Sequence, residues 1–236
     1  MAEILVLSGP SLGQPVRLVT FPSIDYRDAW KWQHKTADAV RDGELETLAL
    51  LQHTPVYTFG RLVRTKHLLI TPGEISERGA VLVESDRGGD ITFHGPGQLV
   101  GYPILDLHRR HLTPSAYVHA LEETLMRAMS SFGLAPYRIH NRPGVWVHGA
   151  KLAAIGVRVQ GGVTSHGFAL NVHTDLSWFD AIVSCGISDA SVTSMEQLLG
   201  AAPCFEAVEA TVAAAFEEVF RSDLLRASVA PSTWIE

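Results

Sequence analysis

The sequence predicts an α+β fold, and three observations support that prediction. Strand-like runs gather in the middle of the chain, at residues 144–147, 151–159 and 165–172. Long amphipathic helical patterns lie outside this group, at 114–132 and 205–220. No internal repeat or low-complexity linker divides the 236 residues. Because strands and helices are segregated along the chain, we expect one α+β domain spanning residues 1–236.

The first fifty residues predict two short strands, a helix and a buried strand. The short strands are expected at 3–7 and 16–21, and the continuous apolar run at 47–52 suits a buried strand. The helix is expected at 25–41, with Gly43 just past its end. Helical spacing predicts a buried face of Ala29, Trp32 or Gln33, Ala37 and Val40.

The clearest helix is the one at 114–132. Thr113 suits its N-cap, Pro114 its first helical position and Gly133 the position after its end. The turns between the central strands are expected at the two pairs His148-Gly149 and Gly161-Gly162, and the tail at 222–236 is expected to be irregular. In the helix at 114–132, core-facing positions are predicted at Val118, Leu121, Leu125, Met129 and Phe132. In the helix at 205–220, they are predicted at Val208, Val212, Phe216 and Val219.

Composition argues against several classes of protein. Hydrophobic residues make up 46% and charged residues 19%, an ordinary globular balance. No run approaches the roughly 20 apolar residues of a membrane-spanning helix, and residues 1–7 lack the basic start of a secretory signal. Two cysteines give neither a disulfide framework nor a metal motif, so we expect a cytoplasmic protein. A net charge of −6 argues against nucleic acid as a partner.

One segment, from Arg87 to Gln98, is unlike an ordinary core strand. It reads Arg-Gly-Gly-Asp-Ile-Thr-Phe-His-Gly-Pro-Gly-Gln, a polar–apolar alternation with glycines on both sides. Glycine lets another group approach the bare main chain, and the arginine and the histidine supply donors at the two ends. The pattern indicates a ligand pocket, although two turns around a structural strand would look the same. The predicted pocket residues are Arg87, Gly88, Gly89, Asp90, Ile91, Thr92, Phe93 and His94.

Cys185 is the candidate nucleophile. It lies in Ser-Cys-Gly-Ile, after an apolar run and before a helix-start signal at 194–197. Gly186 leaves main-chain N–H groups open to a substrate oxygen. A free cysteine is more commonly a small buried hydrophobe, and the residues alone leave that alternative open. Cys204 lies between a proline and a phenylalanine at a helix entry and is expected to be structural.

Lys151 is the candidate activating residue, because a thiol reacts as its thiolate. It precedes the apolar residues 152–155. An ammonium touching the sulfur would favour the thiolate by up to about 4 kcal/mol at an effective dielectric of roughly 20. The alternative is an exposed strand end.

His94 would orient the thiol or the substrate, or else be an ordinary strand-end histidine. We find no metal-ligand spacing among the histidines.

The pocket segment resembles the signature of the lipoyl(octanoyl) transferases. Further stretches match this family in order, and the likeness runs from about residue 55 to 197. They are Pro-Val-Tyr-Thr-Phe-Gly-Arg at 55–61, Lys-Leu-Ala-Ala-Ile-Gly-Val-Arg at 151–158, His-Gly-Phe-Ala-Leu-Asn-Val at 166–172 and Val-Ser-Cys-Gly-Ile at 183–187. The resemblance implies a mixed sheet like that of biotin and lipoate protein ligases. It also implies substrate contacts at Ala154, Ile155, Gly156, Gly167, Phe168 and Ala169.

The resemblance further implies octanoyl transfer through a covalent intermediate. Cys185 would take octanoyl from the phosphopantetheine of acyl carrier protein. It would pass the chain to a lysine of lipoyl domains, in 2-oxoacid dehydrogenase complexes and the glycine cleavage H protein. Lys151 would stabilise the thiolate first and accept a proton later. Small strand residues would leave a groove for the chain, whose burial contributes about 0.8 kcal/mol per methylene. The implied enzyme is a monomer that needs neither ATP nor a metal.

Three other functions remain open. An ATP-dependent lipoate or biotin ligase on the same fold needs no nucleophilic cysteine. A carrier-binding module has no use for a lysine beside a thiol, and a cysteine hydrolase usually has a histidine partner.

The family pattern has a glutamate where Gln52 precedes His53, which leaves the role of this histidine open. Because the expected protein partners are acidic, a local basic patch should bind them, with candidates Arg61, Arg64, Lys66, Arg138 and Arg142.

Overall fold

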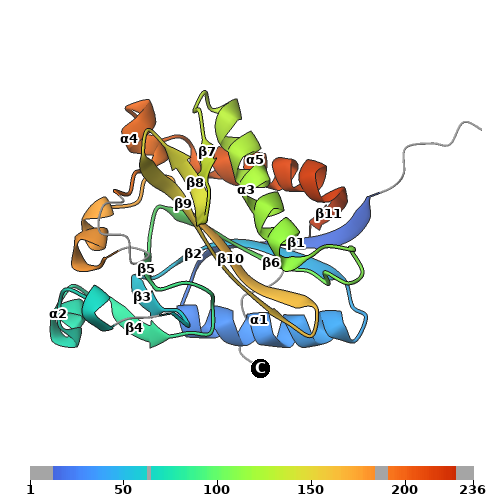
Figure 1. Ribbon diagram of the computed structural model, residues 1–236, viewed down its shortest axis with the longest axis horizontal. Helices are drawn as coiled ribbons and strands as arrows, with labels where there is room; N and C mark the ends of the chain where they lie inside the picture. Colours follow the sequence, from blue (N-terminus) through green and yellow to red (C-terminus); the bar gives the residue numbers. More distant parts are fainter. Residues whose placement is uncertain (1–12, 63–64, 184–190, 227–236) are drawn as a thin grey trace, which may run out of the picture.

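The computed structural model describes residues 13–62, 65–183 and 191–226. Its strands form a large sheet in the order β11-β1-β2-β6-β10-β9-β8-β7 and a small sheet in the order β4-β3-β5 (Figure 1). In the large sheet β1 runs parallel to β2 and β11 while β6, β9 and β10 pair antiparallel, so the sheet is mixed, as expected. The strand bounds are β1 Gln14–Ile24, β2 Glu46–His53, β3 Val56–Phe59, β4 Val81–Glu84, β5 Ile91–His94, β6 Gln98–Ile104, β7 Tyr137–Ile139, β8 Arg142–Val147, β9 Ala150–Gln160, β10 Val163–Asn171 and β11 Ser222–Arg226.

Helices cover both faces of the large sheet (Figure 1). Helix α1 (Tyr26–Arg41) lies on one face, over a core of aliphatic and aromatic side chains from β1, β2 and β6. Helices α3 (Pro114–Ser131) and α5 (Phe205–Phe220) lie together on the other face, over the main core. Shorter helical segments are α2 Pro72–Glu77, α4 Met195–Leu199 and the 3-10 turns Thr65–His67 and Leu176–Ala181. This layered arrangement confirms the α+β prediction.

Capping side chains mark where two of the long helices begin. The Asp25 side chain accepts a hydrogen bond from the Arg27 N–H (2.7 Å), so α1 begins one residue after its cap. The Thr113 hydroxyl accepts from the Ala116 N–H (3.2 Å) at the start of α3. That helix ends at Ser131, one residue earlier than predicted, and α5 has the predicted bounds. Local sequence therefore determined where these helices start and stop.

The buried helix faces agree with the predicted spacing, with small differences. Of the two alternatives at one position of α1, Gln33 is the buried residue. In α3 the core side chain is Tyr117, whereas the adjacent Val118 lines the cavity described below. Phe132 and Val219 are only partly buried, because each lies at the end of its helix. Val118 thus gives α3 a second role, in the wall of the cavity, while Leu121, Leu125 and Met129 are buried as predicted.

The strand predictions were less accurate than the helix predictions. β6 lies in the centre of the sheet but was not predicted, because Gly101 and Pro103 interrupt its apolar pattern. The start of the tail predicted as irregular, from Ser222, instead forms β11 and pairs with β1. Parallel pairing between chain ends has no local signal, which explains this error. The strand predicted at 3–7 lies outside the described residues.

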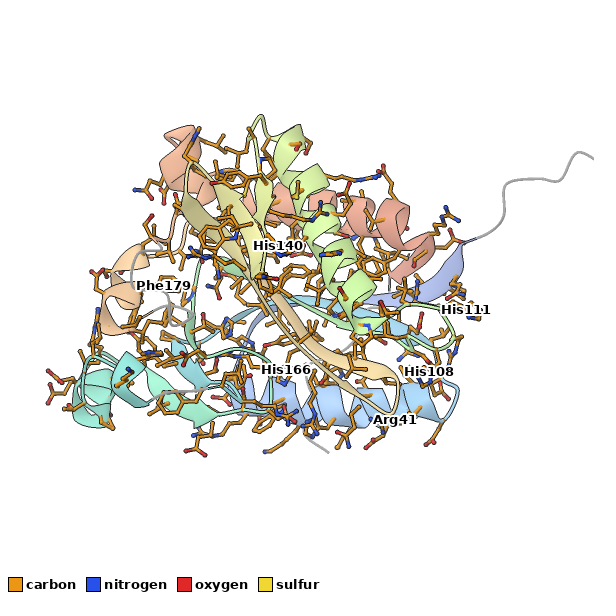
Figure 2. All side chains as sticks on the ribbon, viewed as in Figure 1. Arg41, His108, His111, His140, His166 and Phe179 are labelled. Carbon is orange, nitrogen blue, oxygen red and sulfur yellow. The ribbon has the colours of Figure 1, made fainter. Side chains whose placement is uncertain are left out.

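The small sheet has its own aromatic core. Phe93 of β5 stacks on Trp178 with 4.9 Å between ring centroids, and Phe179, labelled in Figure 2, packs edge-on against Phe93 at 5.8 Å. The Tyr57 hydroxyl donates a hydrogen bond to the Trp178 carbonyl (2.7 Å). These contacts attach the small sheet to the segment that follows β10, and so hold β5 in place.

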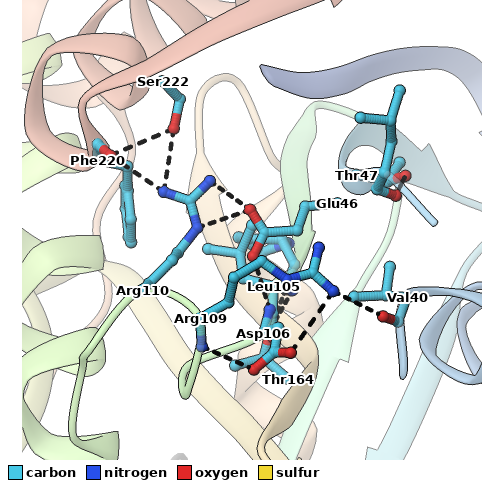
Figure 3. A network of polar contacts seen from close by, with 12 residues as sticks. Val40, Glu46, Thr47, Leu105, Asp106, Arg109, Arg110, Thr164, Phe220 and Ser222 are labelled. Atoms are coloured by element: carbon cyan, nitrogen blue, oxygen red, sulfur yellow. Dashed lines mark hydrogen bonds and ion pairs between the residues drawn. The ribbon is translucent and has the colours of Figure 1, made fainter. Parts of the chain in front are cut away.

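A buried ion pair joins β2, β11 and the loop after β6 (Figure 3). The Arg110 guanidinium lies 2.5 Å from the Glu46 carboxylate, and both side chains are buried. Glu46 also accepts a hydrogen bond from the Asp106 N–H (2.8 Å). Arg110 donates to the Phe220 carbonyl (3.0 Å) and the Ser222 hydroxyl (3.2 Å). Segments distant in sequence are therefore connected through one arginine.

Candidate active site

A cavity of about 950 Å³ is lined by the large sheet, α1 and the segment 87–94. Its floor is formed by neighbouring strands of the sheet. Ala169 of β10 pairs with Ala154 of β9, and Gly167 pairs with Gly156, so these four small residues share one face. Val100 of β6 lines the cavity beside them. Small residues at paired positions leave a groove wide enough for a linear alkyl chain.

Three of the expected substrate residues direct their side chains elsewhere. Ile155 and Phe168 alternate to the opposite face of β9 and β10, where they pack in or against the main core. Both are nevertheless among the residues that line the cavity. Phe93 is fully buried in the core of the small sheet. A motif match covers consecutive residues, but a strand presents only alternate side chains to one face.

Arg87 holds one wall of the cavity. Its guanidinium donates to the Thr58 hydroxyl (3.0 Å), the Thr58 carbonyl (2.6 Å) and the Gly88 carbonyl (2.9 Å). The Gly88 N–H in turn donates to the Val157 carbonyl of β9 (3.0 Å). These bonds connect the small sheet to the large sheet across the cavity wall, so much of the donor capacity of Arg87 is used within the protein.

Two glycines of this wall occupy positions where a side chain would be unfavourable, one because of its backbone conformation and one because of a close contact. Gly89 has a φ of +85°, which favours glycine. A Cβ on Gly156 would lie 3.0 Å from the Gly88 carbonyl oxygen, which is tighter than an ordinary contact. The remaining expected residues of the segment also line the cavity; these are Asp90, Ile91 and Thr92.

Lys151 is buried in the cavity wall, with 6% of its surface exposed. Its ammonium lies 4.9 Å from the centroid of the Trp146 ring. Its N–H donates to the Ser191 carbonyl (2.9 Å), and its carbonyl accepts from the Thr193 N–H (3.0 Å). The alternative of an exposed strand end is therefore wrong, because Lys151 is buried and lines the cavity.

The expected nucleophile, Cys185, and the adjacent Gly186 lie outside the described residues. The described residues that flank them are beside the cavity. Val183 lines the cavity and donates to the His67 carbonyl (2.8 Å). After the gap, the chain resumes at Ser191, which contacts the main chain of Lys151 as given above. Cys204 is exposed at the start of α5 and does not line the cavity.

His94 lines the cavity as a buried, neutral group. Its Nδ1 lies 2.7 Å from Oε1 of Gln98, and its ring stacks on Tyr26 with 6.0 Å between centroids. Burial lowers the pKa of His94 well below its usual value, and the neighbouring His53 and Arg87 lower it further. A neutral imidazole can exchange hydrogen bonds with a substrate without carrying a charge.

His53 belongs to the same cluster, although the sequence left its role open. It is fully buried, with Nδ1 2.9 Å from the Ile24 carbonyl and Nε2 2.6 Å from the Tyr102 hydroxyl. A carbonyl only accepts, so Nδ1 carries the hydrogen and Nε2 accepts from Tyr102. Burial lowers the pKa of His53 to about 4 and raises that of Tyr102 well above its usual value.

His166 was missed as a site residue, although it begins one of the matching stretches. It lies between β10 and α1 (Figure 2), lines the cavity and has a φ of +57°. Its Nε2 is 2.7 Å from the Asp86 carboxylate, and burial lowers its pKa to about 3. Tyr26 and Tyr102, which also line the cavity, were missed because they lie within helix and strand patterns typical of plain core.

The basic candidates for partner binding separate into different settings. Lys66 and Arg142 line the cavity. Arg138 instead pairs with two glutamates of α3, at 3.1 and 2.8 Å. Arg61 is exposed, and Arg64 lies outside the described residues.

Across the described ranges, no group of three or more His, Cys, Asp or Glu side chains is arranged to hold a metal ion. Within the same ranges, no helix is both long and apolar enough to cross a membrane.

Solved structures establish the fold independently of sequence identity. Lipoate-protein ligase A bound with ATP superimposes with a TM-score of 0.75 at 13% identity, covering 93% of this chain and 90% of that one. The bi-partite lipoate protein ligase of Thermoplasma acidophilum gives a TM-score of 0.75 at 14% identity, covering 94% and 89%. At these identities, the likeness shows the architecture alone.

Sequence relatives identify the family. Residues 25–217 match the model of the lipoyl protein ligase A/B catalytic domain. The octanoyltransferase of Mycobacterium tuberculosis H37Rv is 49% identical over 196 residues, which cover 82% of each chain. The octanoyltransferase of Rubrobacter xylanophilus is 48% identical over 197 residues, covering 82% of this chain and 88% of that relative. The chain therefore belongs to the octanoyltransferases, acyltransferases of the lipoyl protein ligase A/B catalytic-domain family.

Proposed function

We propose that the enzyme moves octanoyl from acyl carrier protein to a lysine of lipoyl domains through a thioester on Cys185. The observation that carries this proposal is the buried ammonium of Lys151, in the wall of a cavity floored by small residues. An ammonium beside a thiol favours the thiolate, because the two charges attract each other. Lys151 would stabilise the thiolate of Cys185 in this way, and its ammonium also lies over the Trp146 ring.

Chain length supports Cys185 as the nucleophile. It follows Val183 by two residues, and two residues of chain span at most about 7 Å. Val183 lines the same cavity as Lys151, and the Ser191 carbonyl accepts from the Lys151 N–H, so described residues on both sides of Cys185 adjoin the proposed site.

In the first half-reaction, the Cys185 thiolate attacks the thioester carbon of octanoyl-acyl carrier protein. The bond from that carbon to the phosphopantetheine sulfur breaks, and the leaving thiolate takes a proton from Lys151. Octanoyl-Cys185 and a neutral Lys151 remain. One thioester replaces another, so the step is nearly isoenergetic and needs no ATP.

In the second half-reaction, the neutral amine of a lipoyl-domain lysine attacks octanoyl-Cys185. An amide bond forms, the bond to the Cys185 sulfur breaks, and the proton released by the amine goes to Lys151. Thiolate and ammonium are thereby restored together. Conversion of a thioester to an amide is downhill, so this step is driven by the acyl bond itself.

Intact-mass measurement tests the proposal. The enzyme is incubated with octanoyl-acyl carrier protein in the absence of nucleotide, and a single octanoyl adduct is expected on Cys185. The adduct should be released by hydroxylamine, as a thioester is, and should discharge when a lipoyl domain is added. Cys185→Ser should lose nearly all turnover because a serine hydroxyl is far less acidic than a thiol. Cys204→Ser is the matched control and should form the adduct.

An ATP-dependent lipoate ligase is the second candidate function, favoured by the likeness to lipoate-protein ligase A bound with ATP. This alternative predicts no adduct from the acyl thioester and an absolute requirement for ATP with free octanoate or lipoate. Normal turnover of Cys185→Ser, or activity only with ATP, would replace the transferase proposal with the ligase.

A further inference from the structure

A chain of amide side chains connects His94 to the main chain near Lys151. Oε1 of Gln98 faces Nδ1 of His94, while Nε2 of Gln98 donates to Oδ1 of Asn171 (2.9 Å) and to the Phe93 carbonyl (3.2 Å). Nδ2 of Asn171 donates to the Thr193 carbonyl (3.0 Å). His94, Gln98, Asn171 and Thr193 are all buried, as is Phe93.

The two carbonyl partners determine the direction of every hydrogen bond in this chain. A carbonyl oxygen only accepts, so the Asn171 atom facing Thr193 is the NH2 group, and its oxygen faces Gln98. The Gln98 atom facing the Phe93 carbonyl must likewise be its NH2 group. The Gln98 oxygen therefore faces His94, so Nδ1 of His94 carries the hydrogen and Nε2 has a free electron pair.

His94 borders the cavity, and its Nδ1 is hydrogen-bonded to Gln98. Nε2 is therefore the ring nitrogen that is left to accept a hydrogen bond from a substrate. Gln98 and Asn171 also line a small void of about 20 Å³ together with Lys151. The amide chain and the proposed proton carrier thus border the same part of the site.

We propose that Gln98 and Asn171 are positioning residues, which hold His94 as a hydrogen-bond acceptor for the amine that discharges the octanoyl thioester. This inference rests on the proposed function. The octanoyl chain itself has no N–H or O–H group, whereas the attacking amine carries N–H groups and must be oriented toward the thioester carbon. Lys151 takes the proton, and the weakly basic His94 orients the amine that releases it.

Nitrogen NMR of the ¹⁵N-histidine-labelled full-length enzyme tests the hydrogen placement. The His94 signals, assigned by their loss in His94→Gln, should show a one-bond hydrogen coupling at Nδ1 and none at Nε2. In Gln98→Leu this preference should be lost or reversed. Gln197→Leu is the matched control, because Gln197 accepts from the Thr193 hydroxyl (3.0 Å) but lies outside the amide chain. A hydrogen on Nε2 in the wild-type enzyme would overturn the proposal.

Separate measurement of the two half-reactions tests the role of the acceptor. Gln98→Leu and Asn171→Leu should slow discharge of the octanoyl enzyme to a lipoyl domain by about tenfold, the loss expected from one substrate hydrogen bond. Loading from octanoyl-acyl carrier protein should change less than about threefold. Equal losses in both half-reactions, or none in either, would mean that the amide chain is only structural. Failure of the wild-type enzyme to load would instead refute the proposed function, and the NMR result would still stand.

Discussion

Two buried arginines organise opposite parts of this molecule, and they do so with different partners. Arg110 is paired with the buried carboxylate of Glu46 and joins three segments into one closed region (Figure 3). Arg87 donates to the Thr58 side chain and main chain and to Gly88, in the wall of an open cavity. The region around Arg110 is held together by a buried ion pair, whereas the region around Arg87 borders a cavity.

The difference shows how this fold separates stability from activity. Near Arg110, the guanidinium and the Glu46 carboxylate pair with each other and with neighbouring main-chain groups. Around the cavity, His94 and Lys151 are buried and line a space of about 950 Å³, which has room for a substrate. Substitutions in the two regions should therefore affect different measurements.

The largest expected effect is on stability and follows from breaking the Arg110 region. Arg110→Ala leaves Glu46 buried without its ion-pair partner, so the free energy of unfolding should fall by about 3–5 kcal/mol. Urea unfolding followed by circular dichroism measures this loss. Arg127→Ala, which removes a pair with Glu123 on the exposed side of α3, is the control and should cost less than about 1 kcal/mol. Similar losses for both variants would contradict the comparison.

The next effect is on activity and follows from breaking the cavity wall at Lys151. Lys151→Ala should lower kcat/KM by about 10²–10³, which corresponds to about 3–4 kcal/mol of transition-state stabilisation. Alkylation of Cys185 should then require higher pH. Lys151→Arg keeps the charge but cannot act as a base, so it should retain more loading than transfer. Equal and small effects of both substitutions would rule out a catalytic role.

The third effect is the acid sensitivity of the histidine cluster. His53 has a folded pKa of about 4, below its usual 6.5, so the unfolded chain binds a proton between these values that the folded chain does not. The contribution of His53 to stability is fully present above pH 6.5 and is lost as the pH falls toward 4. The loss should be on the order of 3 kcal/mol. His53→Gln should reduce the slope of the unfolding free energy against pH over this range, and His94 and His166 should retain the remainder. An unchanged slope would contradict the assignment.

The smallest effect is on partner binding at the basic residues that line the cavity. Lys66→Glu combined with Arg142→Glu should raise KM for acyl carrier protein by about 5- to 10-fold at low salt, with kcat nearly unchanged. Added salt should reduce the difference, because exposed charges are screened. Arg138→Glu is less informative, since Arg138 is already engaged by two glutamates. An unaltered KM at low salt would exclude this docking surface.

Sequence alone determined the helices and the chemistry-bearing segments. Caps such as Thr113 act within one turn, and the helical period of α5 repeats over sixteen residues, so both are legible locally. The segment from Arg87 to His94 and the residues around Lys151 indicate a site because glycines and isolated polar groups are unusual in a buried strand. This signal is local and does not depend on long-range contacts.

Only the tertiary structure decided which of these residues meet, and on which face. Pairing of β9 with β10 directs Ala154 and Ala169 into the cavity and turns Ile155 and Phe168 away from it. The same folding brings His53 and Tyr102, about fifty residues apart, into hydrogen-bonding contact. Burial, which shifts the pKa values of these histidines, arises from contacts between distant segments. The sequence therefore determined the reactive groups, whereas long-range packing decided their orientation and protonation.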